Sequence, residues 1–436
     1  MVAFRGIYFF WGGENNMIAN PCHYALAFFI FTVCALETRA ADEWPQFRGP
    51  TGQGFSDTKG LPLTWSETNN IVWKTALPGI GYSSPAVSGE RVWLTASPDK
   101  GKTRHVLCVD LKTGALKRDI TLFTYDVSEP CHAMNSHSTP TPVLEGNRVY
   151  VTFGNPGTAC LDAETGQTLW ERRDIKTRYF DVGAASSPVL CGNALILTCD
   201  GQPDAERFVI ALDKNTGKTL WRTDRTYPGN VIPKRTHSSC TPLVIEVAGK
   251  PQVISPGGQG VRAYDPLTGH ELWVARYEGW SVVPSPVYAD GLLFSCGGSD
   301  KHFMYCIRPE GASGDITDVT NLVWKSVRNV PTMSSPLMVG NRLYLLNAAT
   351  MSCLEPATGN KIWAHNLSGQ HLASPVVAEG RIYLFNSTGG SSVVAQGDTF
   401  RVLATNRLDS GCYASPAVVG RSLLVRTTSH LYRIGK

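Results

Sequence analysis

The sequence has few charged residues, no basic cluster and no second apolar run after its first forty residues. Charged side chains make up 17% of the 436 residues, against about 25% in an average globular protein, which argues against a long solvated helix bundle. With 42% hydrophobic residues the chain can bury a large core, so it is not a disordered protein. Forty Lys and Arg against 36 Asp and Glu give a net charge of +4, spread along the chain, and no nucleic-acid partner is implied.

Motifs of the common catalytic and metal sites are also missing. The chain has no CxxC, GxSxG or HExxH motif and no phosphate loop. His132 and His137 are five residues apart in a connecting segment, which is no established ligand spacing, and His237 would have to join them from two repeats away. We therefore predict no metal site and assign no catalytic residue.

Residues 1–40 have the features of a secretory signal. The run from Tyr24 to Leu36 is uncharged and too short to span a bilayer comfortably, and Thr38-Arg39-Ala40 fits a small-x-small cleavage site. We expect cleavage near Ala40 and a secreted or periplasmic protein of the cell envelope, peripheral to the membrane at most. A start at Met17 and an uncleaved anchor remain open alternatives.

An internal repeat is the main positive signal of the sequence. Small residues followed by a proline and an apolar strand recur eight times, at Pro85, Pro142, Pro188, Pro242, Pro286, Pro336, Pro375 and Pro416. The mean interval is about 47 residues, which is the length of a four-stranded propeller blade. The repeat predicts an all-β fold, an eight-bladed β-propeller of four-stranded antiparallel blades. The serines before these prolines recur from blade to blade, so we interpret them as structural.

Each repeat contains two turn signals. The first is a Gly-x pair four residues after most of the prolines, as in Gly89-Glu90 and Gly146-Asn147, which suits a two-residue hairpin. The second is Asp-x-x-Thr-Gly, or Glu-x-x-Thr-Gly in one copy, whose side chains can bind local backbone amides. Its glycines are Gly114, Gly166, Gly217, Gly269 and Gly359. Four copies carry a Trp eight residues after the acid.

The Asp-x-x-Thr-Gly-x-x-x-Trp motif resembles the tryptophan-docking motif of the PQQ-like (pyrroloquinoline-quinone-type) repeat propellers, which include the BamB-like proteins. The resemblance covers residues 65–436. The opening segment Trp44–Pro50 is similar to that of secreted propellers of the planctomycete type. The resemblance implies that each Trp packs between neighbouring blades. The residues in question are Trp73, Trp170, Trp221, Trp273, Trp324 and Trp363.

The ends of the repeat region predict how the propeller closes. The last copy stops after about three strands, whereas Ile71–Thr75 is a fourth strand without a blade. We expect this N-terminal strand to complete the final blade and so remove an open edge. The domain organisation is then a signal at 1–40, an extended segment at 41–64 and the propeller at 65–436.

Most of the twelve cysteines are interpreted as buried apolar residues. Cys108, Cys160, Cys306 and Cys353 each lie two residues before the turn acid or its equivalent, where other blades have alanine. One disulfide among the remaining cysteines would suit an oxidising compartment. The sequence leaves its pairing open, and the cysteines concerned are Cys131, Cys240, Cys296 and Cys412.

The long connections between blades are the candidate binding regions, because loops on a rigid scaffold are where binding sites are usually built. They should share one face and one sector of the propeller; the alternative is that they are solvated insertions. The candidate residues are His132, Asn135, His137, Arg178, Tyr179, Arg235, His237 and Trp280.

Two classes of function remain open. The first is a non-catalytic, monomeric envelope propeller that binds a protein or peptide, as the BamB-like resemblance implies. The second is a diverged quinoprotein dehydrogenase that uses PQQ with calcium to oxidise alcohols or sugars, with Trp280 as the stacking floor. Those dehydrogenases carry a vicinal cysteine pair and long excursions that this sequence lacks, which favours the first class.

Overall fold

The computed structural model describes residues 43–176, 182–201, 206–227 and 233–435. The chain divides into two units, Met1–Arg39 and Ala40–Lys436, and the predicted signal lies outside the described residues. Within the described ranges, no helix has the length and apolar character to cross a membrane. The helices described there are two short 3-10 segments, η1 (Asp99–Gly101) and η2 (Pro233–Thr236).

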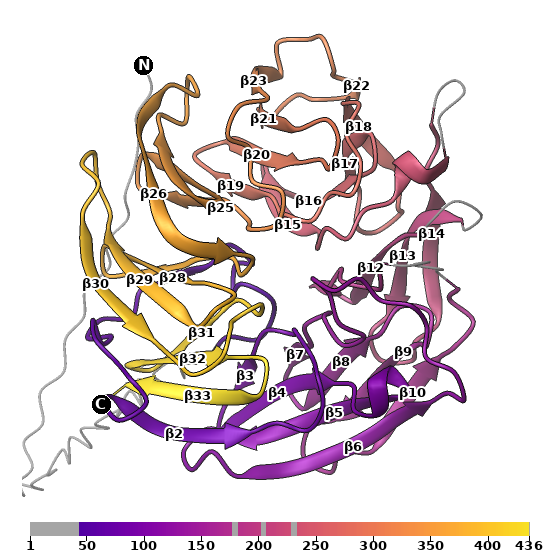
Figure 1. Ribbon diagram of the computed structural model, residues 1–436. Helices are drawn as coiled ribbons and strands as arrows, with labels where there is room; N and C mark the ends of the chain where they lie inside the picture. The colour runs from indigo at the N-terminus through magenta and orange to yellow at the C-terminus, as the bar shows by residue number, and fades with distance from the viewer. Residues whose placement is uncertain (1–42, 177–181, 202–205, 228–232, 436) are drawn as a thin grey trace, which may run out of the picture. The chain divides into compact units, whose positions relative to one another are not determined.

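The described residues of Ala40–Lys436 form eight sheets, each built on an antiparallel blade, that follow one another around a ring (Figure 1). Blade 1 contains β3 (Ala86–Ser88), β4 (Arg91–Ala96), β5 (Thr103–Asp110) and β6 (Leu116–Thr124). Blade 2 contains β7 (Val143–Glu145), β8 (Arg148–Thr152), β9 (Thr158–Asp162) and β10 (Thr168–Arg172). Blade 3 contains β11 (Val189–Cys191), β12 (Ala194–Asp200), β13 (Arg207–Asp213) and β14 (Thr219–Asp224). Blade 4 contains β15 (Leu243–Val247), β16 (Lys250–Gly257), β17 (Gly260–Tyr264) and β18 (Glu271–Arg276).

The second half of the ring repeats this pattern with small changes. Blade 5 contains β19 (Val287–Ala289), β20 (Leu292–Gly297), β21 (Phe303–Ile307) and β23 (Leu322–Ser326). Blade 6 contains β24 (Leu337–Val339), β25 (Arg342–Leu354) and β26 (Lys361–His371); β25 pairs with β24 near its start and with β26 near its end. Blade 7 contains β27 (Val376–Ala378), β28 (Arg381–Phe385), β29 (Gly390–Ala395) and β30 (Val402–Arg407). The eight-bladed all-β propeller is therefore confirmed.

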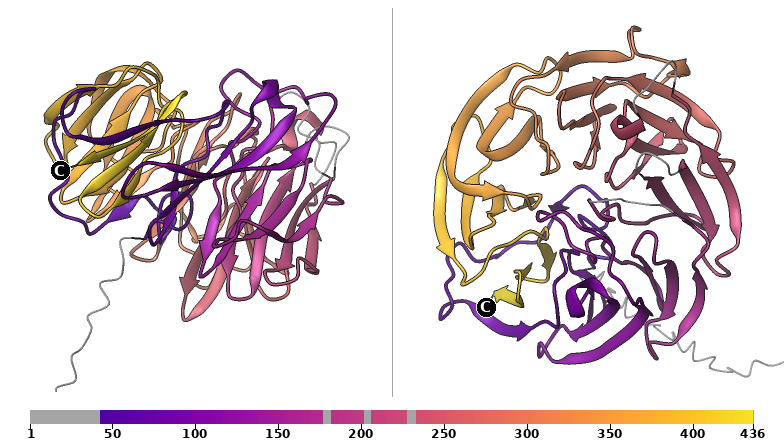
Figure 2. Two further views of the ribbon diagram at one scale, coloured as in Figure 1. Left: turned by 90° about the horizontal axis from the view of Figure 1, so that it is seen from below. Right: turned by 45° about the vertical axis from the view of Figure 1, so that its right-hand side comes forward.

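The N-terminal strand closes the ring as the sequence predicts. Blade 8 contains β31 (Ala417–Val419), β32 (Ser422–Arg426), β33 (His430–Gly435) and β2 (Ile71–Ala76). β2 pairs antiparallel with β33, with Trp73 opposite Arg433. The indigo β2 and the yellow C-terminal strand lie side by side (Figures 1 and 2). The free edge of β33 is thereby covered.

The turn signals form the predicted hairpins. Gly89 and Gly146 adopt φ values of 57° and 55°, a region in which glycine has no steric penalty. In blade 1, Asp110 Oδ1 accepts hydrogen bonds from the backbone N–H and the hydroxyl of Thr113, both at 2.8 Å. These bonds lower the pKa of the Asp110 carboxyl. Asp162 and Thr165 make the same pair of contacts in blade 2.

The Ser/Thr residues before the prolines link one blade to the next around the centre. In seven of these links a backbone N–H donates to the hydroxyl of the equivalent residue in the following blade, at 2.9 to 3.1 Å. The series includes Ser84 to Thr141 and ends with Ser415 to Ser84. These hydroxyls are therefore structural, as expected.

Five of the tryptophans contact the following blade. Trp73 Nε1 donates to Leu111 O at 3.0 Å, and a Cβ built on Gly114 would lie 2.7 Å from the Trp73 ring. Trp170, Trp221 and Trp324 bind the residue after the turn acid in the same way, and Trp363 binds Gly397 O. Gly217, Gly269 and Gly359 lie under the rings of Trp170, Trp221 and Trp324 in the same way, and the missing side chain lets each indole approach the backbone of the next blade. No glycine lies under the Trp363 ring in this way, because a Cβ on Gly397 would meet no atom within 4 Å.

Trp273 and Gly166 depart from the interblade contact that the resemblance implies. Trp273 Nε1 donates to Gln252 Oε1 within its own blade. The following blade has no Thr-Gly turn, and its two-residue strand β22 (Gly314–Asp315) instead pairs with β18 beside Trp273. Gly166 faces Arg118 and Ile120 because blade 1 has no tryptophan at the docking position.

The segment from Glu43 to Ser56 lies across the centre of the ring, which the sequence did not indicate. Trp44 pairs with Val87 of blade 1, and Pro45 O accepts from Leu144 N of blade 2. On the other side, Arg48 Nη2 donates to Pro336 O at 2.7 Å, and β1 (Phe55–Ser56) pairs with β27 of blade 7. Trp44 and Arg48 are fully buried. The segment thus occupies the free edges of several innermost strands.

The cysteine expectations are partly wrong. Cys131, Cys240, Cys296 and Cys412 are all free thiols, so the disulfide expected among them is absent. Cys240, Cys296 and Cys412 are fully buried on or beside different blades, which makes them apolar packing residues. The four cysteines that precede the turn acids are buried as expected, and they are Cys108, Cys160, Cys306 and Cys353.

Candidate functional site

The strand order assigns every connection to one of two ends of the propeller. Successive strands of a blade run antiparallel, so the connections between blades and the hairpins between second and third strands share one end. We call this end the connection face. The hairpins between first and second strands and between third and fourth strands form the opposite end, the turn face. The segment of residues 43–56 starts at the turn face, where Ser88 Oγ donates to Glu43 Oε1. The chain is again at this face at Gly60, whose backbone N–H donates to Glu379 Oε2.

The predicted site residues in the first long connection bond within the connection face. Asn135 Nδ2 donates to Val182 O at 2.6 Å, which ties the connection before blade 2 to the connection before blade 3. His137 Nε2 lies 2.6 Å from Glu129 O, and its ring covers Gly101. His132 is exposed, and its Nδ1 accepts from Met134 N. Asn135 and His137 therefore shape the connections.

A second group of predicted residues lies between blades 4 and 5. Arg235 Nη2 forms an ion pair with Asp300 Oδ2 at 3.5 Å. The buried His237 ring packs edge-on against Trp280, with the ring centroids 4.9 Å apart. This group is held by contacts to blade 5, whereas Asn135 and His137 are held by contacts near blades 1 to 3, so one shared site for all of these residues stays a prediction. Arg178 and Tyr179 lie outside the described residues.

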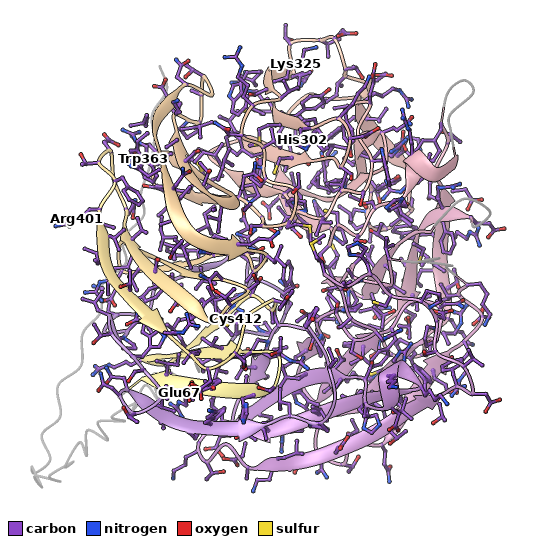
Figure 3. The ribbon with its side chains drawn as sticks, viewed as in Figure 1. Glu67, His302, Lys325, Trp363, Arg401 and Cys412 are labelled. Atoms are coloured by element: carbon purple, nitrogen blue, oxygen red, sulfur yellow. The ribbon has the colours of Figure 1, made fainter. Side chains whose placement is uncertain are left out.

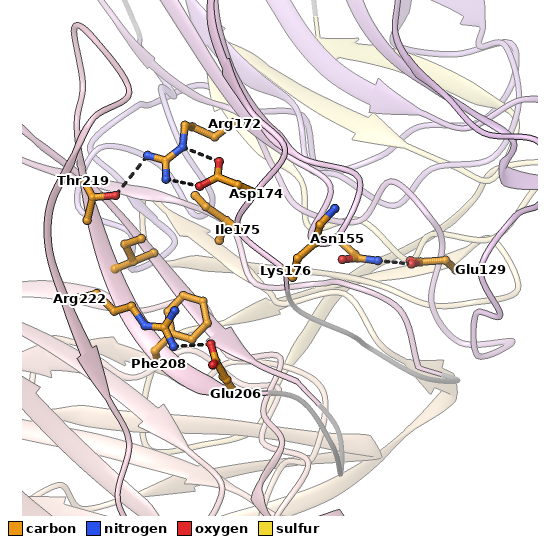
Figure 4. Close-up of a pocket in the computed structure, with 11 residues that line it drawn as sticks. Glu129, Asn155, Arg172, Asp174, Ile175, Lys176, Glu206, Phe208, Thr219 and Arg222 are labelled. Atoms are coloured by element: carbon orange, nitrogen blue, oxygen red, sulfur yellow. Dashed lines mark hydrogen bonds and ion pairs between the residues drawn. The ribbon is translucent and has the colours of Figure 1, made fainter.

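A groove of about 640 Å³ opens on the connection face between blades 2 and 3 (Figure 4). Its floor is the buried apolar cluster that includes Ile175, Phe208 and Ile210. The side chains around this floor come from β10 and the connection after it, from β14, and from the hairpin before β13. Glu129 of the connection before blade 2 and Asn155 of the hairpin between β8 and β9 complete the lining. None of the six predicted site residues that the structure describes lines the groove.

Most of the charges in this groove are already paired. Arg172 Nε lies 2.7 Å from Asp174 Oδ1, and this hydrogen bond lowers the pKa of the Asp174 carboxyl. Arg222 pairs with Glu206 at 2.5 Å and lies over the Phe208 ring at 3.8 Å. Lys176 is exposed and forms no ion pair with a described residue.

A second pocket, of about 550 Å³, opens on the connection face between blades 4 and 5. Its wall is aromatic: the Tyr277 and Phe303 rings stack at 3.5 Å, and Tyr305 meets both rings edge-on. The hairpin of residues 298–302 supplies the opposite side, together with Lys325 and Val327 from the end of blade 5. Figure 3 labels His302 and Lys325 on this blade.

A buried ion pair lies between the two pockets, in blade 3. Arg225 Nε is 2.7 Å from Asp200 Oδ1, and both side chains are inaccessible to solvent. Burial lowers the pKa of the Arg225 guanidinium, but the Asp200 carboxylate outweighs this and raises that pKa overall. Arg225 Nη2 also donates to Ser255 Oγ of blade 4 at 2.7 Å. The pair fixes the start of the connection that carries Arg235 and His237.

Sequence analysis missed both pockets, because their walls are made of strand residues that resemble ordinary blade residues. The sequence does contain a signal for the buried ion pair, because Asp200 is a charge at the end of the mostly apolar strand of residues 194–200. Among the described residues, no group of three or more His, Cys, Asp or Glu is placed to hold a metal ion.

Comparison with known proteins decides the family. The family model described as outer membrane protein assembly factor BamB matches residues 55–202, 121–326 and 205–435. The chain belongs to the BamB family. A curated member, BamB of Burkholderia pseudomallei, is 23% identical over 339 residues, covering 66% of this chain and 81% of that protein. The crystal structure of BamB from Moraxella catarrhalis has a TM-score of 0.58 at 14% identity and covers 83% of this chain and 99% of that one.

Two enzymes are similar to this BamB-family chain, one in sequence and one in fold. Tetrathionate hydrolase of Acidithiobacillus ferrooxidans is 22% identical over 353 residues, covering 74% of this chain. The match spans 66% of that enzyme's length, just under two thirds. Quinohemoprotein alcohol dehydrogenase from Comamonas testosteroni has a TM-score of 0.62 at 12% identity and covers 92% of this chain and 82% of that one. At this identity the likeness concerns the fold.

Proposed function

We propose that this chain is a non-catalytic scaffold of the cell envelope that binds a protein or peptide partner through its connection face. The observation that carries the proposal is the position of the two pockets. Both exceed 500 Å³ and open on the connection face, between blades 2 and 3 and between blades 4 and 5. The turn-face side of the centre is occupied by residues 43–56 of the chain itself.

The family relationship supports the kind of partner. The matching family model and the B. pseudomallei relative are named as an outer membrane protein assembly factor, which acts on or with other proteins. The predicted signal, with cleavage near Ala40, would deliver the chain to the cell envelope, where an outer membrane protein assembly factor works. The proposed partner is therefore a protein of the envelope, bound by a monomeric propeller.

Site-specific photo-crosslinking in the producing cell tests the proposal. A benzophenone amino acid is placed at Val127 and at Val327, which are 80% and 69% exposed on the connection face. The matched control is Leu267, which is 83% exposed in a turn-face hairpin. The proposal predicts one discrete adduct from both connection-face positions and none from Leu267. An adduct from Leu267 alone would overturn it.

The second candidate function is a quinoprotein oxidoreductase, favoured by the likeness in fold to the quinohemoprotein dehydrogenase. The residues around Trp280 do not fit a cofactor floor. The buried His237 ring packs against Trp280, and the neighbouring Arg235 and Asp300 pair with each other. Titration calorimetry with PQQ and calcium, combined with dye-coupled alcohol and sugar oxidation, separates the two functions. Saturable micromolar binding with turnover would replace the scaffold proposal.

A further inference from the structure

The pocket between blades 4 and 5 has a chemical character that the groove between blades 2 and 3 lacks. Its aromatic wall, Tyr277, Phe303 and Tyr305, lies at the boundary of two blades and is mostly buried. Tyr305 OH donates to Arg276 O of blade 4 at 2.8 Å, so the wall is fixed across the boundary. A rigid aromatic wall of this kind is suited to an apolar or aromatic group of a ligand.

The hairpin opposite this wall is held by glycine. Gly298 has φ 97°, and a Cβ at this position would lie 2.1 Å from Lys301 O. Only glycine allows the backbone to fold this closely, and the fold places Asp300, Lys301 and His302 at the rim. The chain therefore builds the pocket from strand residues on one side and a tight hairpin on the other.

The charges at the rim leave one cation without a partner. Glu278 forms an ion pair with Lys301, and Asp300 forms one with Arg235. Lys325 is exposed and forms no ion pair with any described residue. Both carboxylates of the pocket are thus occupied, whereas one ammonium group remains available. Charge complementarity then favours an anionic ligand over a cationic one.

We propose that this pocket binds an acidic–aromatic peptide segment, with an apolar ring against Tyr277 and Phe303 and a carboxylate beside Lys325. The inference rests on the proposed function, since it names the chemistry that the partner presents to the connection face. Val327, which is 69% exposed at the mouth, adds apolar contact for the same segment. The expected partner sequence has Asp or Glu next to a large apolar residue.

Three small probes with one ring and different charges test the pocket on the purified protein. They are 3-phenylpropionate, 3-phenyl-1-propanol and 3-phenylpropylamine, compared by ligand-observed NMR titration at low and high salt. The carboxylate should bind about two- to fivefold more tightly than the alcohol, as expected for an exposed ion pair. The amine should bind most weakly. High salt should reduce the difference between the probes.

Two exposed substitutions locate the effect without disturbing the core. Lys325→Met should abolish the preference for the carboxylate and leave alcohol binding unchanged, whereas Val327→Asp should weaken the carboxylate more than the alcohol. Lys218→Met, an exposed lysine of the turn face, is the matched control and should change nothing. Equal affinity for the three probes, no binding of any of them, or a carboxylate preference that survives Lys325→Met would each overturn the inference.

The probe titrations and the crosslinking experiment test two different claims. The probes report on the isolated protein, while the crosslinking experiment reports on the partner in the cell. Negative probe titrations together with a connection-face adduct would overturn the ligand chemistry alone. A turn-face adduct would overturn the scaffold proposal whatever the probes show.

Discussion

The backbone N–H of Ser415 donates to the hydroxyl of Ser84 at 3.1 Å, across 331 residues of sequence. This bond joins blade 8 to blade 1 on the inner side of the ring, while β2 and β33 join the two ends of the chain on the outer side. Two features therefore close the propeller: the pairing of β2 with β33, and the hydrogen bond to the Ser84 hydroxyl.

Ser84→Ala tests the inner closure. The substitution removes the acceptor of a buried N–H, and we expect a loss of about 1–3 kcal/mol in the free energy of unfolding. Urea unfolding followed by tryptophan fluorescence measures it. Ser313→Ala, at an exposed position of the excursion in blade 5, is the control and should have no effect. Equal stability of the two variants would contradict a role for the hydroxyl.

Gly114→Ala tests the contact between Trp73 and the following blade. Gly114 has φ 76°, and a Cβ there would lie 2.7 Å from the Trp73 ring. Gly89 also has a positive φ, 57°, but its Cβ would meet no atom within 4 Å. Both alanines carry the backbone cost of about 1–2 kcal/mol. Gly114→Ala should be clearly the less stable variant in urea, because it alone displaces the indole.

Asp200 and Arg225 should stabilise the fold only when both are present, because each buried charge needs the other as its partner. Asp200→Ala leaves a guanidinium buried without its carboxylate, and we expect a loss of about 3–5 kcal/mol. Asp224→Ala removes one carboxylate from an exposed pair with Arg222 and should cost at most about 1 kcal/mol. Chemical unfolding of Asp200→Ala, of Arg225→Ala and of the double variant gives the coupling energy of the pair, with Asp224→Ala as the exposed control. Additive losses in the double variant would rule out the coupling.

His371 should make the stability depend on pH. Burial lowers its pKa below the ordinary value of 6.5, and Nδ1 lies 3.0 Å from Ala348 O. As the pH decreases, the unfolded chain takes up the His371 proton before the folded chain does, so the contribution of His371 to stability is constant well above pH 6.5 and falls as the pH decreases below about 6.5. The fall is at most about 1.4 kcal/mol per pH unit for one group.

His371→Gln should remove this part of the pH dependence. Unfolding midpoints at pH 7.5 and 5.5 are compared for the two proteins. The pKa of His430 is also lowered, by burial and by Lys74, so the decisive quantity is the difference between the wild-type protein and the variant. A variant with the same acid sensitivity as the wild-type protein would show that His371 is not responsible.

Repeats and turns made the architecture predictable from sequence. The eight prolines, the Gly-x pairs and the Asp-x-x-Thr-Gly turns are local signals, since each one fixes a hairpin by its own backbone and side-chain bonds. The unpaired strand of residues 71–75 even indicated the closure, because a three-stranded last blade needs a fourth strand. These hairpins form from neighbouring residues alone, so they can be predicted without knowing which blades lie next to each other.

The path of residues 43–56 and the two pockets were not predictable in this way. Arg48 binds Pro336 O, 288 residues further along the chain, and no local pattern indicates such a partner. The pockets form where strands of different blades meet, as with Phe303 against Tyr277. The loop-based choice of His132, Asn135 and His137 selected residues on the connection face, but none of the three lines either pocket.

Hydrogen–deuterium exchange of the protein alone and in complex with the partner captured at Val327 tests the central claim most directly. The account predicts slower exchange in residues 125–142 and 298–302, which lie on the connection face. Exchange in the turn-face hairpins of residues 110–114 and 265–269 should be unchanged. Protection of these turn-face hairpins, with no change in the connections, would contradict a partner-binding connection face.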